Sequence, residues 1–439
     1  MVETQTKPNI FWAWSDAVDF QKRGDVTYWL PTSFSLANLS HRLSDFVELS
    51  DLRFDPINNP NGRFFYIDIS NINTADGSYN KIETQNAYAP SRARKKLEQL
   101  DVIVSTVRPN RNATSIILEK NGSLVCSTGF AVLKAKKINP YYLFVFTKTP
   151  YFINQLVRQT SATMYPAVNE KDILNVAVFV PTTKDQQNIE QIIKEAFQLK
   201  KEAETDYQNS QQLLNETLGL TGVERKREKV FTRWSNEIDF VERLDVGYWQ
   251  QPTIKVSGTK LSEVASVNTG KQYAVYENAK SEVEFISIKD FENLYVGEAD
   301  RFVLKDDVIE KTRITRGDIL LAVTGATIGK VGIFNRPRAV VSADVAIIRS
   351  KTLKPNFLGA LIQSRYGKSL IDKYTYGATN KHLDIKGFSG NFIVPQIDKK
   401  IADKVSNLLD SSSKHREESR RKLQEAKDFV ENLIKRNSE

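Results

Sequence analysis

The feature that most constrains this chain is a sixteen-residue phrase that occurs twice. Residues 14–29 read WSDAVDFQKRGDVTYW and residues 234–249 read WSNEIDFVERLDVGYW, with nine identical positions at an offset of 220. Because self-similarity over a long period reflects repeated structural units, it constrains the architecture before any local pattern does. The phrase therefore predicts that the chain contains two related halves.

The repeat extends well beyond this phrase. Each half has an apolar burst after an aspartate, LDVIVSTVRP at 100–109 and GDILLAVTGA at 317–326. Each then has a second burst that begins with serine, STGFAVL at 127–133 and SADVAII at 342–348. Along the unit the offset drifts only from 220 to about 214. This small drift favours duplication of a whole domain over coincidence.

The bursts indicate the type of domain that was duplicated. They are short, rich in β-branched residues and bounded by Gly, Pro or Asn, which is typical of strands. Proline-started segments follow at Pro140 and Pro355, where proline suits the first turn of a helix. We therefore expect an α+β protein with two pseudo-symmetric β-rich domains, separated by two long antiparallel α-helices that form a coiled-coil-like spacer.

Each half ends in a segment without Gly or Pro whose apolar residues recur every three or four positions. The first seam includes Ile189, Ala196 and Ala203, the second includes Val405 and Val430, and both are polar in the middle. A seam this narrow needs a partner, and the other helix is the obvious one. The alternative is two separate surface helices.

These patterns divide the chain into six segments. The boundaries are an N-terminal segment at 1–31, a mixed domain at 32–183, a central helix at 184–222, a linker with the second phrase at 223–251, a second mixed domain at 252–396 and a C-terminal helix at 397–439.

Composition narrows the possible chemistry. The 439 residues carry a net charge of +9 with a pI near 9.2, which favours an anionic partner such as nucleic acid, although a merely basic protein has the same balance. A single cysteine, Cys126, and three histidines far apart in sequence disfavour a disulfide framework, a metal site or a nucleophile–base pair. No apolar run is long enough for a membrane helix and no signal segment is evident, so we expect a cytoplasmic protein.

Two motifs resemble catalytic loops without their essential features. GATIGKVG at 325–332 is one residue short of a phosphate-binding loop, and Val331 replaces the residue that would hold magnesium. Its flanks are strand-like, so a hairpin with a basic tip is expected. NPYY at 139–142 resembles a methyltransferase loop but lacks its second proline, and no glycine-rich cofactor turn precedes it. We therefore expect a chain that is not an enzyme.

Basic and amide side chains gather in the loops of both mixed domains. Such groups neutralise phosphates, and arginine pairs with guanine edges, although any single one is equally well a solvated surface charge. The candidate DNA contacts are Arg92, Arg94, Lys95, Arg108, Asn110 and Arg111 in the first half, and Lys271, Arg313, Arg316, Thr324, Thr327, Lys330, Arg336, Asn380 and Lys381 in the second.

Together these features resemble the specificity subunit of Type I restriction-modification systems, over almost the whole chain. The resemblance rests on GDILLAVTGATIGKVGIF followed by YGATNKHLDI in the second half, and on APSRARKKLEQLDVIVSTVRPN in the first. The phrase RLDVGYW and the two domain-ending helices complete it. The first half has TVRPNRNATS in place of the GATIGKVG tip, so the two tips should contact DNA differently.

The resemblance implies a function and a set of partners. Each mixed domain would be a target-recognition domain that reads one half of a split asymmetric site in the major groove of double-stranded DNA. The helices would set the unread spacer between the halves. Two modification subunits would bring S-adenosylmethionine and methylate adenine, and two restriction subunits would use ATP and Mg²⁺ to translocate and cleave. The specificity subunit itself would bind no cofactor, and the assembly would be prokaryotic.

The aromatic residues of the repeated phrase have a separate expected role. We expect them to pack at the helix ends and to help seat the modification subunits. These residues are Trp14, Phe20, Tyr28, Trp29, Trp234, Phe240, Tyr248 and Trp249. Two alternatives remain at this point: a related bipartite-site system whose partner is a fused nuclease–methyltransferase, and a coiled-coil adaptor that binds only protein.

Overall fold

The computed structural model describes residues 41–120, 122–160, 166–220, 248–249, 254, 256–277 and 282–436. The chain divides into two compact units, Met1–Leu199 with Glu418–Glu439 (unit 1) and Lys200–Glu417 (unit 2). Each unit contains a domain of mixed helix and strand together with part of both long helices. The expected α+β class is confirmed.

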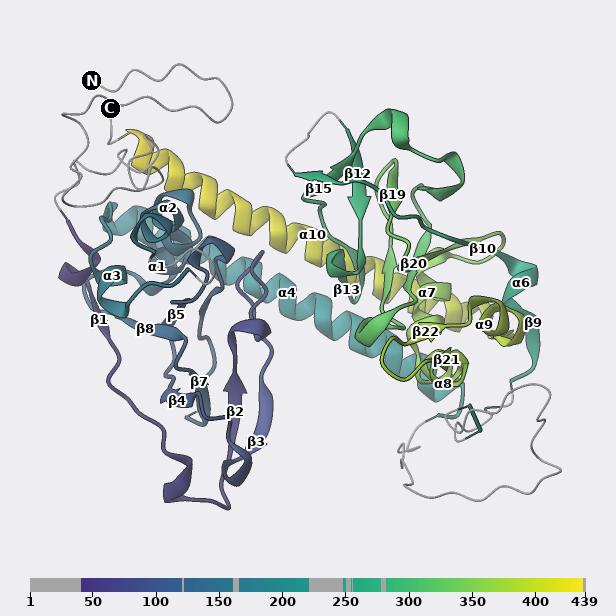
Figure 1. Ribbon diagram of the computed structural model, residues 1–439, viewed down its shortest axis with the longest axis horizontal. Helices are drawn as coiled ribbons and strands as arrows, with labels where there is room; N and C mark the ends of the chain where they lie inside the picture. Colours follow the sequence, from purple (N-terminus) through teal and green to yellow (C-terminus); the bar gives the residue numbers. More distant parts are fainter. Residues whose placement is uncertain are drawn as a thin grey trace. The chain divides into compact units, whose positions relative to one another are not determined.

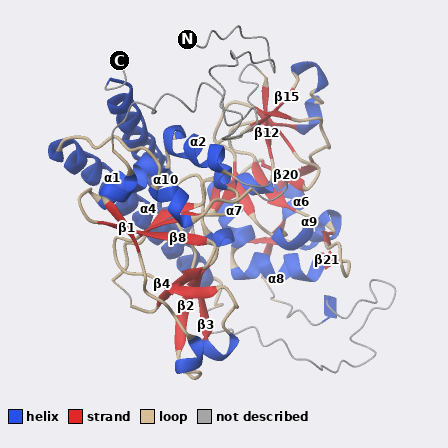
Figure 2. Ribbon diagram, turned by 60° about the vertical axis from the view of Figure 1, so that its left-hand side comes forward, coloured by secondary structure: helices blue, strands red, loops and turns tan. Residues whose placement is uncertain are grey.

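Unit 1 contains two four-stranded sheets. The first has the order β1-β8-β5-β6, and all its neighbouring strands are antiparallel. The second has the order β3-β2-β7-β4, with β2 and β7 parallel, and in both views it lies at the far end of the unit from α1 and α2 (Figures 1 and 2). The elements are β1 (Val47–Leu49), β2 (Arg63–Ile67), β3 (Ile82–Gln85), β4 (Ala93–Lys96), β5 (Val102–Ser105), β6 (Thr114–Ile116), β7 (Leu124–Ser127), β8 (Phe130–Ala135), α1 (Pro140–Thr147), α2 (Pro150–Gln159) and α3 (Glu170–Leu174).

The core of unit 1 follows from its apolar bursts. All four residues of β5 are buried, so this strand lies inside the domain. Helix α1 begins at Pro140 as expected, and the Asn139 side chain caps it by accepting a hydrogen bond from the backbone N–H of Tyr141 at 2.9 Å. Because every residue of α1 after Pro140 is buried, the helix anchors the first sheet to the rest of the unit.

Unit 2 repeats this plan with additional strands. Its larger sheet has the order β10-β20-β17-β18-β14-β13, and its second sheet has the order β11-β15-β12-β19-β16. Two short pairs, β21-β22 and β23-β9, complete it. The elements are β9 (Gly258–Lys260), α6 (Leu261–Val264), β10 (Ala265–Thr269), β11 (Tyr276–Glu277), β12 (Val283–Ile286), β13 (Phe291–Glu292), β14 (Leu294–Val296), β15 (Arg301–Val303), β16 (Arg313–Ile314), β17 (Ile319–Ala322), β18 (Val331–Ile333), β19 (Ala339–Val341), β20 (Val345–Ser350), α7 (Pro355–Gln363), α8 (Arg365–Tyr374), β21 (Thr375–Tyr376), β22 (His382–Leu383), α9 (Ile385–Asn391) and β23 (Ile393–Pro395).

The duplication is preserved in the register of the strands. In unit 1, Val102 of β5 pairs with Leu133 of β8, and in unit 2 Ile319 of β17 pairs with Ile348 of β20. These partners lie 217 and 215 positions apart in the sequence, within the drift of the repeat. The motif GATIGKVG spans the antiparallel connection from β17 to β18, so the expected hairpin is confirmed.

A buried carboxylate supports the start of the central strand in both units. Asp101 accepts a hydrogen bond from the backbone N–H of Glu98 at 2.7 Å, and Asp318 accepts one from Thr315 at 2.8 Å. Both aspartates are almost fully buried. The turn before β5 and the turn before β17 therefore have the same internal support.

The long helices α4 (Thr183–Thr217) and α10 (Lys399–Arg436) contact each other within each unit (Figure 1). In unit 1 the Ser419 hydroxyl donates to the backbone carbonyl of Ala196 at 2.7 Å. In unit 2 the Ser412 hydroxyl donates to the carbonyl of Ala203 at 2.6 Å. A step of seven residues back along α10 matches a step of seven forward along α4, so the expected antiparallel pairing is confirmed. The polar middle of the seam is thus buried and hydrogen-bonded rather than open.

Candidate DNA interface

In unit 2 the structure brings together the two motifs that carried the resemblance. The backbone N–H of Gly325, in GATIGK, donates to the carbonyl of Lys381, in YGATNKHLDI, at 2.9 Å. Thr324 and His382 form a β-bridge, and the N–H of Leu383 donates to the carbonyl of Val323 at 2.9 Å. The two loops therefore form one surface element, which we call tip 2 (residues 323–329 and 377–383).

Unit 1 contains the same element built from different residues. The backbone N–H of Arg108 donates to the carbonyl of Pro166 at 2.7 Å, and Val107 and Ala167 form a β-bridge. The N–H of Val168 donates to the carbonyl of Thr106 at 2.9 Å. Each of these contacts matches one in tip 2, so we call residues 106–112 and 166–168 tip 1.

The backbone dihedral angles of the two tips also correspond. Arg108 has φ 49°, and Gly325, 217 positions later, has φ 70°. Asn112 has φ 51°, and Gly329, again 217 positions later, has φ 88°. Left-handed backbone is routine for glycine and uncommon for arginine. Tip 1 therefore carries side chains at two positions where tip 2 has none.

Most of the candidate contacts on the two tips face solvent. Asn110 and Arg111 are exposed on tip 1, where Arg108 is half-buried. Thr327, Asn380 and Lys381 are exposed on tip 2, whereas the half-buried Thr324 donates from its hydroxyl to Asp344 at 2.8 Å. Polar groups of this kind are suited to hydrogen bonds with phosphates or base edges.

Tip 2 also presents an aromatic group that sequence reasoning missed. Tyr376 of β21 is 50% exposed, and its ring lies 6.1 Å from that of His382. The sequence signal was the alternation around YGATNKHL, which places a tyrosine at the edge of a polar loop. Exposed aromatic groups beside polar loops are common at recognition surfaces.

Two of the candidate lysines donate to backbone carbonyls of their own unit, Lys95 from a buried position and Lys330 from an exposed one. The buried ammonium of Lys95 donates to the carbonyl of Phe130 at 2.6 Å and pairs with Glu170. Lys330 donates to the carbonyl of Phe291 at 2.9 Å. Lys95 is buried and has two internal partners, so we leave it out of the proposed interface. Lys330 remains exposed, and its contact with DNA stays a prediction.

The guanidinium of Arg336 is also committed to internal acceptors. It donates to Glu284 at 2.8 Å and to the carbonyls of Val296 and Gly297 at 3.2 and 3.0 Å. An arginine that satisfies a carboxylate and two carbonyls joins the segments that supply them. Arg336 is therefore also left out of the proposed interface.

The remaining candidates lie on the two mixed domains away from the tips. Arg92, Lys271 and Arg316 are exposed. Arg94 is half-buried and donates to the carbonyl of Ala93 at 2.8 Å, and Arg313 pairs with Glu310 at 3.2 Å. Of these, the exposed cations remain predictions for phosphate contact.

A lysine beneath tip 1 holds the tip in place. The Lys148 ammonium donates to the carbonyls of Thr74 and Asn112, at 3.1 and 3.3 Å. Burial lowers the pKa of Lys148 to about 8, because a charged ammonium loses hydration there. The end of tip 1 is thus tied to helix α1 and to the loop that carries Thr74.

The repeated aromatic phrase is only partly visible. Trp14, Phe20, Tyr28, Trp29, Trp234 and Phe240 lie outside the described residues. Tyr248 is buried in the same core cluster as Leu214 near the end of α4, and its ring lies 5.7 Å from that of Tyr374. Trp249 packs against Tyr248 with ring centroids 5.0 Å apart. These two aromatics support the fold of unit 2, and a role in seating partners stays a prediction.

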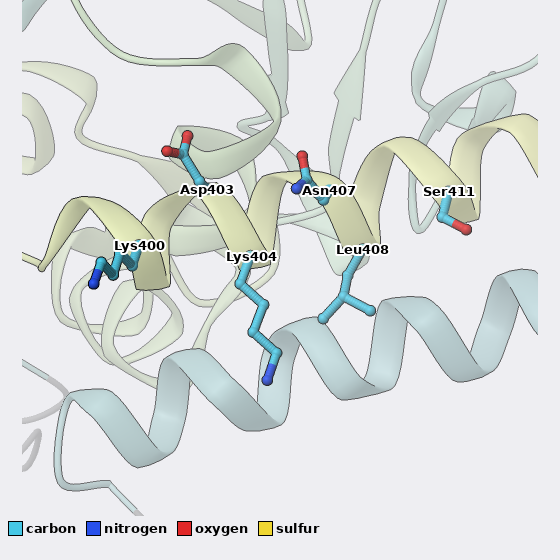
Figure 3. Close-up of a pocket in the computed structure, with 6 residues that line it drawn as sticks. All are labelled: Lys400, Asp403, Lys404, Asn407, Leu408 and Ser411. Atoms are coloured by element: carbon cyan, nitrogen blue, oxygen red, sulfur yellow. The ribbon is translucent and has the colours of Figure 1, made fainter.

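Among the described residues, no group of three or more His, Cys, Asp or Glu side chains is placed to hold a metal ion. A hollow of about 500 Å³ lies along α10, but its lining residues all belong to that one helix (Figure 3). Asp403, at its edge, is paired with Lys354 at 2.9 Å. In the same residues no helix has the length and apolar character of a membrane span.

Comparison with known proteins gives results consistent with this geometry. Residues 255–423 match the family model described as a Type I restriction modification DNA specificity domain. The chain is 24% identical over 345 residues to the Type I restriction enzyme MjaVIII specificity subunit of Methanocaldococcus jannaschii, covering 74% of this chain and 76% of that protein.

Two solved structures are also similar. The HsdS subunit from Thermoanaerobacter tengcongensis matches with 20% identity and a TM-score of 0.34, covering 90% of this chain and 95% of that one. The Type I restriction-modification S subunit from M. genitalium matches with 10% identity and a TM-score of 0.41, covering 91% and 96%. The family-model match thus lies in the second half of the chain, and the curated relative, matched over about three quarters of both chains, is itself the specificity subunit of a Type I restriction enzyme.

Proposed function

We propose that each unit reads one half of a bipartite, asymmetric DNA site, with tip 1 and tip 2 directed at the major groove. The observation that carries this proposal is that two tips share backbone contacts but expose different side chains. A common scaffold with different polar groups suits two related acts of recognition on different sequences. The net charge of +9 supports a polyanionic partner.

Substitutions on the tips test this assignment. Replacing Asn380 and Lys381 by alanine should relax recognition of one half-site, and replacing Asn110 and Arg111 should relax the other. A direct base contact is worth about 1–3 kcal/mol, whereas a phosphate contact weakens binding to every sequence alike. Mapping of methylated adenines in a host that carries the complete system would identify which half changes. Variants that leave both half-sites intact would remove the tips from the interface.

We also propose that α4 and α10 set the number of unread base pairs between the half-sites. The seven-residue step between the Ser–Ala contacts allows a deletion that preserves the seam. Removing residues 197–203 and 413–419 places Ala196 opposite Ser412, which restores one contact of the same kind. Seven residues span roughly 10 Å of helix, or about three base pairs, and the remaining helix rotates by only about 20°.

The deletion variant should therefore methylate sites with the same halves and a spacer shorter by about three base pairs. Lys201→Ala with Lys414→Ala changes two exposed residues of the same region without shortening it, and should keep the original spacer. An unchanged spacer with altered half-sites in the deletion variant would contradict the proposed role of the helices.

Specificity subunits of this family assemble with partner subunits and bind DNA. We further propose that the assembly contains two modification subunits and two restriction subunits in the prokaryotic cytoplasm. In that arrangement S-adenosylmethionine, ATP and Mg²⁺ belong to the partners. The mass of the purified assembly, measured by sedimentation, would test the stoichiometry.

A further inference from the structure

Unit 1 carries an apolar projection that neither tip 1 nor the core uses. Ile57 is 77% exposed and Tyr88 is 78% exposed, the highest values among the large hydrophobic side chains of the described residues. They lie on two single-turn 3₁₀ helices, Pro56–Asn58 and Asn86–Tyr88, which contact each other. We call this element the apolar projection (residues 55–62 and 85–89).

The apolar projection is held in one conformation by its own hydrogen bonds. The Asp55 carboxylate accepts from the N–H of Ile57 at 3.0 Å. The Asn86 side chain donates to the carbonyl of Asn59 at 2.7 Å, and its backbone N–H donates to Gly62 at 2.9 Å. Because these turns are already ordered, binding through them costs little further conformational entropy.

Beneath the projection is a small apolar cluster. The rings of Phe54 and Phe64 lie 4.7 Å apart, and Phe64 is almost fully buried with Tyr66. Apolar residues nearby thus do find a core, whereas Ile57 and Tyr88 point away from it. Ile57 and Tyr88 are exposed because of the direction of the local backbone, and not because the interior lacks space for apolar side chains.

The projection adjoins arginines that were candidate DNA contacts. The N–H of Phe54 donates to the carbonyl of Arg94 at 2.8 Å, and Tyr88 lies four residues before the exposed Arg92. The charged residues on the segments around the projection are Arg53, Arg63, Arg92 and Arg94, against Asp51, Asp55 and Glu83. Arg63 pairs with Glu83 at 3.1 Å, and the exposed Arg53 and Arg92 contribute to a small positive balance that suits a polyanion.

Size also favours DNA over a protein partner. A stable protein interface buries roughly 800 Å² on each side, which two side chains on single turns do not supply. By contrast, one or two apolar groups are enough to contact a thymine methyl group or to wedge against a base step. Apolar side chains do both in protein–DNA complexes.

We propose that Tyr88 and Ile57 contact DNA bases, so that unit 1 reads its half-site partly through apolar contact, in addition to the polar contacts of tip 1. This inference rests on the proposed function and adds a second recognition element to it. The shared chemistry is an apolar side chain against the apolar part of a base. The base part is either a thymine methyl group in the major groove or the face of a partly unstacked base.

The test uses the full chain assembled with its modification subunits and a duplex that contains the mapped target. Tyr88→Ala should weaken binding about 5- to 100-fold, the range for loss of one aromatic contact to a base. The slope of affinity against salt should stay unchanged, because no phosphate contact is lost. Tyr88→Phe keeps the ring and should bind like the wild type.

Ile57→Ala provides a second variant, and Ile82→Ala is its matched control. Ile82 is 53% exposed at the opposite end of β3 from the projection, so its loss should leave affinity unchanged. The melting temperature of each variant separates loss of binding from loss of folding. Since Tyr88 and Ile57 are mostly exposed, neither substitution should lower it by more than a few degrees.

Modified duplexes distinguish the two kinds of base contact. Replacing thymine by uracil removes only the methyl group, so a matching loss in the wild type that is absent in Tyr88→Ala indicates a methyl contact. A rise in 2-aminopurine fluorescence on binding, lost in Tyr88→Ala, indicates an unstacked base. Either result supports the proposal.

Three results would overturn it. If Tyr88→Ala and Ile57→Ala bind like the wild type while Arg111→Ala loses affinity, the projection is outside the interface and the proposed function stands. If Tyr88→Ala releases the modification subunits, the projection binds protein. If a target duplex binds no better than unrelated DNA for any chain tested, the proposed function fails together with the inference.

Discussion

The two tips differ in side chains but not in backbone, and this comparison shows where their geometry comes from. Tip 2 has glycine at 325 and 329, and tip 1 has Arg108 and Asn112 at the matching left-handed positions. If the glycines alone defined the loop, tip 1 would fold differently. The bridges and cross-loop hydrogen bonds therefore hold the conformation, and the residue type determines only its energetic cost.

The difference has a consequence for function. A left-handed residue other than glycine costs roughly 1–2 kcal/mol, and such strain persists where the surroundings hold it. Tip 1 accepts this cost at Arg108 and gains a cation at the apex of the loop, whereas tip 2 has only a backbone there. We infer that unit 1 contacts DNA more through Arg108 and its loop, whereas unit 2 contacts DNA more through the adjoining loop with Asn380 and Lys381.

The largest expected effect separates the two carboxylates that support the turns before β5 and β17. Asp318 binds Arg349 through two hydrogen bonds of 2.7 and 2.6 Å, whereas Lys134 approaches Asp101 at 3.2 Å. Burial raises the pKa of Asp101, so part of its ion-pair gain is already lost. Asp318→Ala should cost about 3 kcal/mol of unfolding free energy, and Asp101→Ala about 2.

Hydrogen exchange of the amides in β17 and β5 measures each loss within its own unit. Lys351→Ala, an exposed change near Arg349 in sequence, serves as the control and should leave β17 unaffected. A larger loss at Asp101 than at Asp318 would show that the paired hydrogen bonds do not govern the difference.

The second prediction exchanges the residues at one pair of matching left-handed positions, Arg108 in tip 1 and Gly325 in tip 2. Arg108→Gly removes a strained side chain and should keep or raise the melting temperature while lowering DNA affinity. Gly325→Arg should cost about 1–2 kcal/mol, all of it from the backbone, because a Cβ at this position meets nothing within 4 Å. Thermal unfolding and binding to the mapped duplex give both quantities.

Gly258→Ala provides a comparison in which the added side chain has no room. There a Cβ would lie only 1.9 Å from the carbonyl oxygen of Val394, so the loss should exceed that at Gly325. If Gly325→Arg lowered the unfolding free energy as much as Gly258→Ala, contacts other than the backbone hydrogen bonds and the β-bridge would have to hold tip 2.

The strands and the helix pairing were predictable from sequence because they depend on pattern alone. The β-branched bursts became β5, β8, β17 and β20, and the uninterrupted seams became α4 and α10. Both patterns report burial of a face, which the alternation of apolar residues encodes directly.

Side-chain direction was less accessible from the sequence. The basic character of the stretch around Lys95 suggested a DNA contact, yet the alternation of β4 turns Lys95 inward between the half-buried Arg94 and the exposed Lys96. Nothing local in the sequence shows that the turns carrying Ile57 and Tyr88 point outward. The apolar projection could be found only once the turns were placed.

The serines in the polar middle of the second seam give the third prediction. Their pattern was available, since Ser412 and Ser419 lie seven residues apart opposite Ala203 and Ala196. Ser412→Ala and Ser419→Ala should each cost about 1 kcal/mol, because each removes one buried hydrogen bond between the two helices. Urea denaturation monitored by circular dichroism at 222 nm would measure it.

Substitution with leucine at the same positions tests whether close approach of the helices matters. Ser412→Leu and Ser419→Leu insert bulk where the helices contact each other, and overpacking typically costs 1–3 kcal/mol. Equal losses of unfolding free energy would show that the pseudo-symmetry of the two units extends to the helix seam. Unequal losses would show that the seam differs between the units. If leucine were tolerated as well as alanine, close approach of the helices would not matter at these positions, because both variants lack the same hydrogen bond.

The smallest effect is a pH dependence confined to unit 1. Lys148 has a folded pKa of about 8, below the usual lysine value of 10.5, while the position 215 residues later is the uncharged Gln363. Between these two values the unfolded chain binds more protons than the folded one, so stability contributed by this group rises with pH. The free-energy cost of burying the charged Lys148 ammonium is fully present below about pH 8 and disappears as the pH passes 10.5.

Comparing Lys148→Gln with the wild type from pH 7 to 10 isolates this contribution. The variant copies the residue of unit 2, and the stability difference between the two proteins should change in favour of the wild type as the pH rises. Hydrogen exchange at β6, which follows Asn112, reports the effect in unit 1. Gln363→Lys is the reciprocal change, and it should destabilise unit 2, because the buried Gln363 accepts a hydrogen bond from Tyr207 that an ammonium does not accept. A pH-independent difference at position 148 would mean that the ammonium is hydrated, and that tip 1 is held without it.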